Sequence, residues 1–226
     1  MKKLLFILSA IVLLTACSGD DSGGTKTKLV RKITTTGSDE GDNRTYSFSY
    51  DKQDRVKKMK VVLETATFEM TYTYNELDYL VKAVRTGNSP GTTLLTYDEA
   101  NHLSSISSSE GVIPVTFDNA TQTYNVGGQF PFKVDSGWDF LSYYSFSIES
   151  EGQMKGAFYN AKGNIGALQF GGMPDFFYLG GRRSVKNLKL NGQEALTKVS
   201  IYDEEGFVTS SNVGGALMTL SVEYEY

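Results

Sequence analysis

The feature that most constrains the fold of this chain is a strict alternation of apolar and polar residues in several short segments. Residues 66–74 read Ala-Thr-Phe-Glu-Met-Thr-Tyr-Thr-Tyr, and residues 218–226 alternate in the same way. Residues 46–50 and 144–148 repeat the pattern, with Tyr, Phe or Ile on one face and Ser on the other. A period of two with aromatic side chains on one face is typical of a half-buried antiparallel strand. After the first 16 residues no segment keeps a helical period over more than two turns, so we expect an all-β fold.

Several of these strands end in an aromatic residue followed by Asp or Asn. The pairs are Tyr50-Asp51, Tyr74-Asn75 and Tyr97-Asp98, with fainter copies at Phe117-Asp118 and Tyr202-Asp203. An Asp or Asn at this point can bond its own backbone and start a turn. The first four pairs recur at intervals of 24, 23 and 20 residues. Because one hairpin cannot bury its apolar face alone, the repeat predicts an antiparallel meander that forms a curved or barrel-like sheet with an aromatic interior.

These units resemble the tyrosine–aspartate (YD) hairpins of the Rhs family, whose strands wind into large β shells. The resemblance extends from Phe48 to Val126, although Asp54-Arg55, Asp78-Tyr79 and Asn101-His102 stand where that family usually has Gly-Arg. The enclosing function of those shells is not implied, because they need dozens of units. The hairpins and the Val222–Tyr226 ending also resemble small Bacteroidota lipoproteins of an uncharacterised family with a porin-like β fold.

The N-terminus has the features of a secretory signal peptide. Lys2 and Lys3 precede an apolar run from Leu4 to Leu14 that is too short to span a bilayer as a helix. The following residues, Thr15-Ala16-Cys17, complete a segment that resembles the bacterial lipobox, in which the cysteine is acylated and becomes the mature N-terminus. We therefore expect a signal peptide at 1–16 and an acylated flexible tether at 17–28, rich in Ser, Gly, Asp, Thr and Lys.

The residues after Cys17 indicate where the anchored protein is located. Ser18, in place of the Asp that favours inner-membrane retention in enteric lipoproteins, indicates the outer membrane. The start Cys17–Asp21 resembles the acidic export signal of surface-exposed Bacteroidota lipoproteins. We expect a lipid anchor in the outer membrane with the protein on the cell surface, and a periplasm-facing anchor is the alternative.

Composition narrows the remaining classes. With 22 basic and 26 acidic residues and no long basic run, we expect no nucleic-acid partner. Cys17 is the single cysteine, so disulfides cannot brace the fold, and 14 Tyr and 13 Phe must supply the core. Residues 29–226 are predicted to form one all-β domain, with possible halves at 29–127 and 128–226. A membrane-inserted barrel is the less favoured alternative, because a lipid anchor would then be redundant.

The sequence offers little catalytic chemistry. His102 is the only histidine and lies in a predicted turn, so the usual zinc ligand sets cannot form, and no Gly-x-Ser-x-Gly or Asp-x-Asp-x-Asp motif is present. We expect no cofactor, no metal and no catalytic residue. We therefore expect that this protein is not an enzyme. Glycoside hydrolysis by a pair of carboxylates stays an open alternative, since 26 acidic residues offer many pairs.

Three segments outside the repeat are candidates for ligand binding. Residues 127–132 (Gly-Gly-Gln-Phe-Pro-Phe) break the hairpin series, residues 136–140 hold the only tryptophan, and 171–183 form an aromatic loop between glycine pairs. Aromatic rings beside arginine can stack on sugar faces or form a protein contact. The candidate ligand-binding residues are Trp138, Tyr143, Phe177, Tyr178, Arg182 and Arg183. The alternative is structural: Trp138, Phe176 and Phe177 would close the end of the β core.

Three functional hypotheses follow. The leading one is a non-enzymatic, membrane-anchored binding or interaction module whose partner is an extracellular glycan or an outer-membrane protein. The second is a structural component of a lipoprotein assembly, and the third is a carboxylate-based hydrolase. An exposed aromatic cluster near Trp138 would favour the first, and an uncovered strand edge or apolar sheet face the second. A cleft that joins two carboxylates would favour the third.

Overall fold

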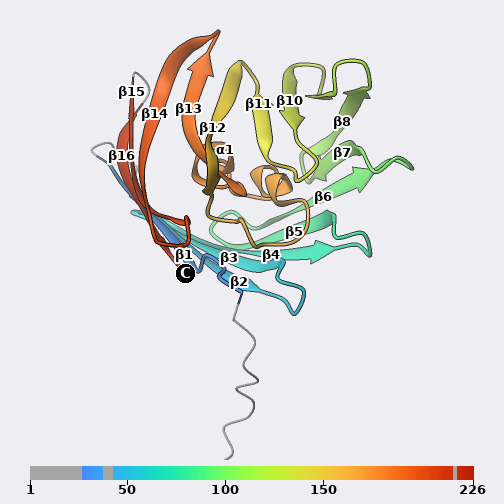
Figure 1. Ribbon diagram of the computed structural model, residues 1–226. Coiled ribbons are helices and arrows are strands. Elements are labelled where there is room, and N and C mark those ends of the chain that lie inside the picture. The colour runs from blue at the N-terminus through green and yellow to red at the C-terminus, as the bar shows by residue number, and fades with distance from the viewer. Residues whose placement is uncertain (1–26, 38–42, 216–217) are drawn as a thin grey trace, which may run out of the picture.

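The computed structural model of the protein describes residues 27–37, 43–215 and 218–226. The predicted signal peptide, Cys17 and residues 17–26 of the predicted tether lie outside the described residues. Within them, sixteen strands form one closed barrel that surrounds two short helical segments (Figure 1).

The strands of the barrel follow one another in chain order. They are β1 Lys32–Gly37, β2 Arg44–Tyr50, β3 Val56–Leu63, β4 Thr67–Tyr74, β5 Leu80–Gly87, β6 Gly91–Tyr97, β7 Leu103–Ser108, β8 Gly111–Asp118, β9 Thr123–Val126, β10 Phe130–Val134, β11 Phe140–Tyr143, β12 Phe146–Lys155, β13 Arg183–Leu190, β14 Gln193–Tyr202, β15 Val208–Gly215 and β16 Thr219–Glu225. Each strand pairs antiparallel with the next, and β1 pairs with β16, for example Ile33 with Tyr224. The predicted all-β antiparallel meander is confirmed, and ring closure leaves none of the described strands with an unpaired edge.

The aromatic–Asx turns gather at one end of the barrel, which we call the Asx end. In the first turn, Oδ1 of Asp51 accepts the backbone N–H groups of Gln53 (2.9 Å) and Arg55 (3.0 Å). Asn75, Asp135 and Asp203 accept two backbone N–H groups in the same way. The residue two positions before the next strand begins has a positive φ in these turns: Asp54 (62°), Asp78 (63°), Asn101 (66°), Trp138 (64°) and Gly206 (82°). Asp, Asn and Trp thus occupy a left-handed backbone conformation, which has a steric cost for these residues and none for glycine.

Tyrosine hydroxyls tie neighbouring strands together at the Asx end. The hydroxyl of Tyr50 donates to the Val30 carbonyl (2.7 Å), and the hydroxyl of Tyr74 to the Val56 carbonyl (2.9 Å). Tyr97 repeats the bond to Leu80, and Tyr226 repeats it to Val208. Each of these four tyrosines therefore satisfies a carbonyl of the neighbouring segment while its ring packs against the core.

The hairpin series continues past Gly127, which corrects the break expected there from sequence. Val126 of β9 pairs with Phe130 of β10 across the glycine turn, and Asp135 starts a further Asx turn. Strands of four or five residues, such as β9 and β10, are too short to show a clear period of two. The strand expected at 144–148 also begins later, because Tyr144 has a φ of 55° in the turn before β12.

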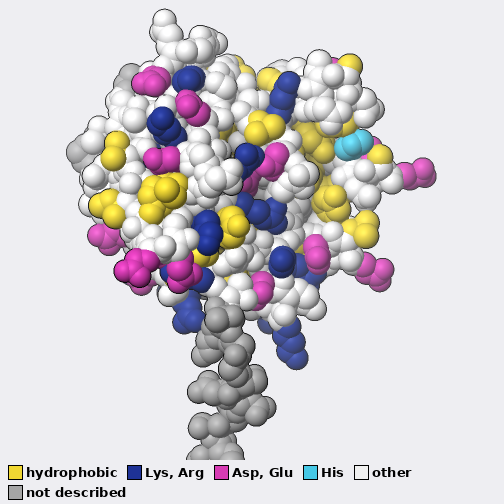
Figure 2. Space-filling view, in the orientation of Figure 1, with side chains coloured by type: hydrophobic (Ala, Val, Ile, Leu, Met, Phe, Trp, Pro, Cys, Tyr) yellow, Lys and Arg dark blue, Asp and Glu magenta, His cyan; other side chains and the backbone are white. Residues whose placement is uncertain are grey.

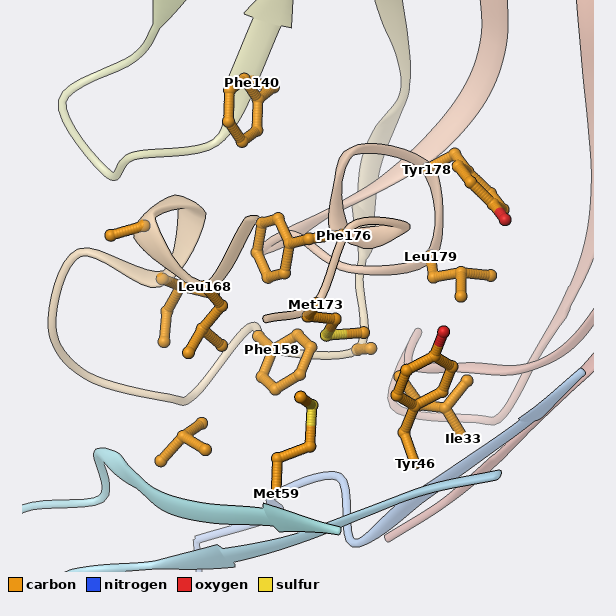
Figure 3. Close-up of a cluster of buried hydrophobic side chains, with 14 of the residues drawn as sticks. Ile33, Tyr46, Met59, Phe140, Phe158, Leu168, Met173, Phe176, Tyr178 and Leu179 are labelled. Atoms are coloured by element: carbon orange, nitrogen blue, oxygen red, sulfur yellow. The ribbon is translucent and has the colours of Figure 1, made fainter. Parts of the chain in front are cut away.

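The departure from the meander lies between β12 and β13. Residues 156–182, which we call the plug, enter the lumen and contain the 3-10 helix η1 (Ile165–Gln169) and the helix α1 (Phe176–Leu179). A closed barrel of sixteen strands encloses more space than its own side chains fill. Phe158, Leu168, Met173 and Phe176 of the plug are at most 1% exposed, and they face Ile33, Tyr46 and Met59 of the wall (Figure 3). The core of this protein is therefore formed between the wall and its own inserted loop.

The wall carries polar and some apolar side chains outside, and mainly aromatic and aliphatic side chains inside. On β4, Phe68, Met70 and Tyr72 are buried, whereas Thr67 and Thr73 are exposed. Figure 2 shows acidic and basic side chains intermixed on the visible face. Among the described residues, no helix has both the length and the apolar character to cross a bilayer.

Candidate functional site

Trp138, the first residue singled out by the sequence, lies in the Asx turn between β10 and β11. Its side chain is 7% exposed, and its ring centroid lies 5.9 Å from that of Tyr124, 6.2 Å from that of Tyr79 and 6.3 Å from that of Tyr97. The plug packs directly against this turn: a Cβ on Gly166 would lie 2.1 Å from the Trp138 carbonyl oxygen. The tryptophan is thus part of the aromatic core at the Asx end.

Arg182 and Arg183 hold the base of the plug where it rejoins the wall. The guanidinium of Arg182 donates to the carbonyls of Gly137 and Gly163. The backbone N–H groups of both arginines donate to the buried carboxylate of Asp139, with N–O distances of 2.8 to 3.0 Å. Burial raises the pKa of Asp139, and these two N–H groups partly offset that rise. The Arg183 side chain donates to Asp135 in the same turn. These contacts fasten the plug to the turn that carries Trp138.

Tyr143, Phe177 and Tyr178 form a second group on the other side of the plug. The rings of Tyr143 and Phe177 stack with centroids 5.3 Å apart, and Phe177 meets Tyr178 edge to face at 5.1 Å. Tyr178 is 5% exposed, and its ring points away from the plug toward the wall (Figure 3). Tyr143 and Phe177 are half-buried.

The structure therefore brings the six candidates together in two groups rather than at one exposed site. Trp138 and Arg182 meet in one group, beside a shallow depression of about 210 Å³ that Tyr79, Gly137 and Asn164 also line. Arg183 holds the adjoining turn, and the three other aromatics form the second group. An exposed aromatic cluster near Trp138, which would favour the binding hypothesis, is not seen among the described residues, since Trp138 is buried among other rings. That any of the six binds a ligand stays a prediction.

A larger hollow lies at the opposite end of the barrel. It has a volume of about 760 Å³ and opens between the plug and strands β2 to β5; we call it the mouth pocket. Its lining includes Arg44, Tyr46, Glu64, Phe68, Arg85 and Phe170. Pockets of about 300–1,000 Å³ with apolar walls and a few fixed polar groups are typical of ligand sites. The mouth pocket therefore has the size and lining of a candidate ligand site.

One cation of the mouth pocket is already neutralised by the plug. Asp175, just before α1, forms an ion pair with Arg44 and accepts the Tyr46 hydroxyl at 2.6 Å. Burial raises the pKa of Tyr46, so its hydroxyl stays protonated and keeps donating. This three-residue contact fixes the plug to β2 and forms the floor of the pocket.

The other cation of the mouth pocket, Arg85, stands at a strand position whose charge is itself informative. β5 places Leu80, Ala83 and Arg85 on its buried face, so a charged residue stands at a position where the pattern calls for an apolar one. The guanidinium carbon of Arg85 lies 3.8 Å from the ring centroid of Phe68. A charge on the inward face of a strand is uncommon unless it is paired or functional, and this position could have indicated the pocket.

The described residues offer no grouping of three or more His, Cys, Asp or Glu that could hold a metal ion. His102 is stacked on Phe117, with ring centroids 3.9 Å apart, and its Nδ1 lies 3.4 Å from Asp98 Oδ2. His102, in the turn before β7, is thus half-buried against an aromatic ring.

Comparison with known families identifies a lipid attachment site at the N-terminus. The prokaryotic membrane lipoprotein lipid attachment site matches residues 1–18. The predicted lipobox is confirmed, and this chain is a membrane-anchored lipoprotein whose folded part is a plugged barrel of aromatic–Asx hairpins.

The hairpins identify the family. The teneurin YD-shell family matches residues 26–166, more than half of the chain. The chain therefore belongs to the teneurin YD-shell family, and the resemblance to YD hairpins is confirmed. The match ends inside the plug, so it includes twelve strands and the first part of the inserted loop.

Among solved structures, the chain is similar to a porin-like protein from Bacteroides uniformis ATCC 8492, determined at 2.32 Å resolution. The sequences are 13% identical, the TM-score is 0.42, and the alignment covers 87% of this chain and 96% of that chain. No curated protein matches.

Proposed function

We propose that this lipoprotein is a non-enzymatic binding module on the outer face of the outer membrane, and that it binds a saccharide in the mouth pocket. The observation that carries the proposal is the pocket itself: about 760 Å³, with the rings of Phe68 and Phe170 beside the planar polar groups of Arg44, Arg85 and Gln169. Aromatic faces and planar hydrogen-bonding groups are the chemistry that recognises the apolar face and the hydroxyls of a sugar.

The position of the N-terminal attachment supports an orientation in which the mouth pocket faces away from the membrane. Lys28 lies at the Asx end, where its Nζ is 2.5 Å from Oδ2 of Asp203 and its carbonyl accepts the Asn160 side-chain amide. The mouth pocket lies at the other end, beside the β3–β4 turn. From Cys17 to Thr27 the chain can extend at most roughly 35 Å. The anchored end therefore faces the membrane, and the pocket faces away from it.

The carboxylates of the pocket favour binding over hydrolysis. Glu64 is the one carboxylate among the described residues that line it, and Asn43 donates to that carboxylate at 2.6 Å. Asp175, beneath the floor, is occupied by Arg44 and Tyr46. Glycoside hydrolysis by the usual route needs two carboxylates that flank the bond to be cut. The pocket supplies recognition groups without that pair.

One observation favours the structural alternative. Val199 and Ile201, on the outer face of β14, are 66% and 64% exposed. Two neighbouring aliphatic side chains in solvent are a small apolar surface that a subunit of an assembly could cover. Purification of the native lipoprotein as a stable complex, lost on Ile201→Lys, would favour that role.

The proposal is tested by a saccharide-binding screen with the purified mature protein and two matched variants. Thr65→Trp places a bulky ring at the rim of the mouth pocket, and Thr121→Trp makes the same change in an exposed turn at the Asx end. We expect binding that Thr65→Trp abolishes and Thr121→Trp leaves intact. Trp138→Ala and Tyr178→Ala test the six residues predicted from sequence, and binding lost in those variants alone would move the site to the plug. A screen with no saccharide bound would contradict the proposal.

Location needs separate measurements. Mass spectrometry of the native protein should show an acylated Cys17 as the first residue. Surface exposure predicts that protease added to intact cells removes the barrel, whereas a periplasm-facing anchor predicts protection until the outer membrane is opened.

A further inference from the structure

Arg85 is the cation of the mouth pocket that forms no ion pair with any of the described residues. Its guanidinium stacks on the ring of Phe68 at 3.8 Å, which fixes the plane of the fork. Its Nε is buried and has no hydrogen-bond partner among the described residues. Leaving a buried donor of a charged group unsatisfied is unfavourable, and such groups in native proteins call for an explanation.

Arg44, the other arginine of the mouth pocket, differs from Arg85 because it has a carboxylate partner. Both arginines line the same pocket, but Arg44 has its carboxylate from Asp175 of the plug. Nothing equivalent reaches Arg85 in the described residues, although a planar guanidinium is suited to binding a carboxylate through two parallel N–H···O bonds.

The remaining lining limits how acidic the ligand can be. Glu64 adds a negative charge near the rim, at the turn that follows β3. Phe68 and Phe170 give the pocket apolar walls. A polyanion would meet more repulsion from Glu64 than a ligand with one carboxylate and an otherwise neutral body.

We propose that the mouth pocket recognises an acidic saccharide through a single carboxylate held by the guanidinium of Arg85. This inference rests on the proposed function and adds the ligand's chemical class to it. The carboxylate can belong to a uronic acid or to a sialic acid, since both present a planar anion beside a sugar ring.

The test is calorimetric titration of the mature protein with pairs of probes that differ by one acidic sugar. The first pair is xylotetraose and a xylo-oligosaccharide that carries one glucuronic acid, and the second is lactose and sialyllactose. In each pair the acidic probe should bind at least tenfold more tightly where its carboxylate reaches Arg85, which is the expected effect of a charge-assisted hydrogen bond. The pair that shows the preference identifies the kind of acid.

The variants separate this inference from the proposed function. Arg85→Gln should remove the preference for the acidic probe, and Lys82→Gln, the same loss of charge on the exposed face of β5, should keep it. Arg85→Lys retains the charge without the planar fork and should give an intermediate preference, which also checks that the site survives substitution. Equal binding of acidic and neutral probes, unchanged in Arg85→Gln, would overturn the role of Arg85 and leave saccharide binding standing. Failure of all four probes to bind would overturn this inference, and the wider screen then decides the proposed function by itself.

Discussion

Lys198 offers a quantitative test of how the plug is held inside the barrel. It projects from β14 into the interior and is 5% exposed. Its Nζ donates to the Tyr224 hydroxyl at 2.9 Å and lies 3.5 Å from the carbonyl of Tyr178 in the plug. Burial lowers the pKa of Lys198 from its ordinary value of 10.5 to about 7.

This pKa makes the stability of the protein depend on pH. The unfolded chain holds the Lys198 proton up to about pH 10.5, whereas the folded protein releases it near pH 7. Between these values the unfolded state binds more protons, so the free energy of unfolding rises with pH. Below pH 7 the lysine is protonated in both states, and its contribution no longer changes. The slope is about 1 kcal/mol per pH unit, so from pH 7.5 to 9.5 this lysine accounts for a gain of about 2 kcal/mol.

Urea unfolding at pH 7.5, 8.5 and 9.5, followed by the fluorescence of the single tryptophan, measures this contribution. We expect Lys198→Met to be more stable than wild type at pH 7.5, because methionine fills similar space without a charge, and the difference should shrink by about 2 kcal/mol by pH 9.5. Lys82→Met, on the exposed face of β5, should keep a constant difference from wild type. A constant difference for Lys198→Met as well would refute the conclusion that burial discharges Lys198.

Three further predictions concern the plug and the turns. Phe176→Ala, which empties a fully buried position in α1, should lower the free energy of unfolding by about 3–5 kcal/mol, while Phe130→Ala, at a position 52% exposed, should have a much smaller effect in the same urea assay. Asn164→Ala should cost about 1–3 kcal/mol, because the Asn164 side chain bonds both the Leu80 N–H and the Tyr97 hydroxyl at 2.7 Å, and Asn164→Asp, which keeps the acceptor for Leu80, should cost less. Asp54→Gly should raise the midpoint of thermal unfolding by removing up to about 1 kcal/mol of strain at a φ of 62°, and Asp54→Val should lower that midpoint.

The turns show how far local patterns determine the structure. Asp51 accepts N–H groups from residues two and four positions later, so the bonds that shape the turn are contained in five consecutive residues. The same holds for Asn75 and Asp203. The strand pattern, the Asx turns and the lipid attachment site could be predicted for this reason: each is a property of a short stretch of chain.

The plug and the mouth pocket depend on contacts that no short stretch contains. Asp175 meets Arg44 across 131 positions of the sequence, and Asn164 meets Leu80 across 84. The aromatic loop at 171–183 departs from the repeat in sequence, but its composition fits an exposed binding loop and a buried plug equally well. The width of the lumen decides between them, and that width depends on how many strands close the ring.

The sequence by itself thus determined that this chain is a lipid-anchored series of aromatic–Asx hairpins, because alternation, turn chemistry and the attachment signal act over a few residues. The tertiary structure alone decided that β1 meets β16, that residues 156–182 fill the lumen, and that Arg85 stands at the barrel mouth with no ion pair to the residues described. These features arise from closing sixteen strands around a space that the wall cannot fill, a global constraint to which every hairpin contributes and which none of them specifies.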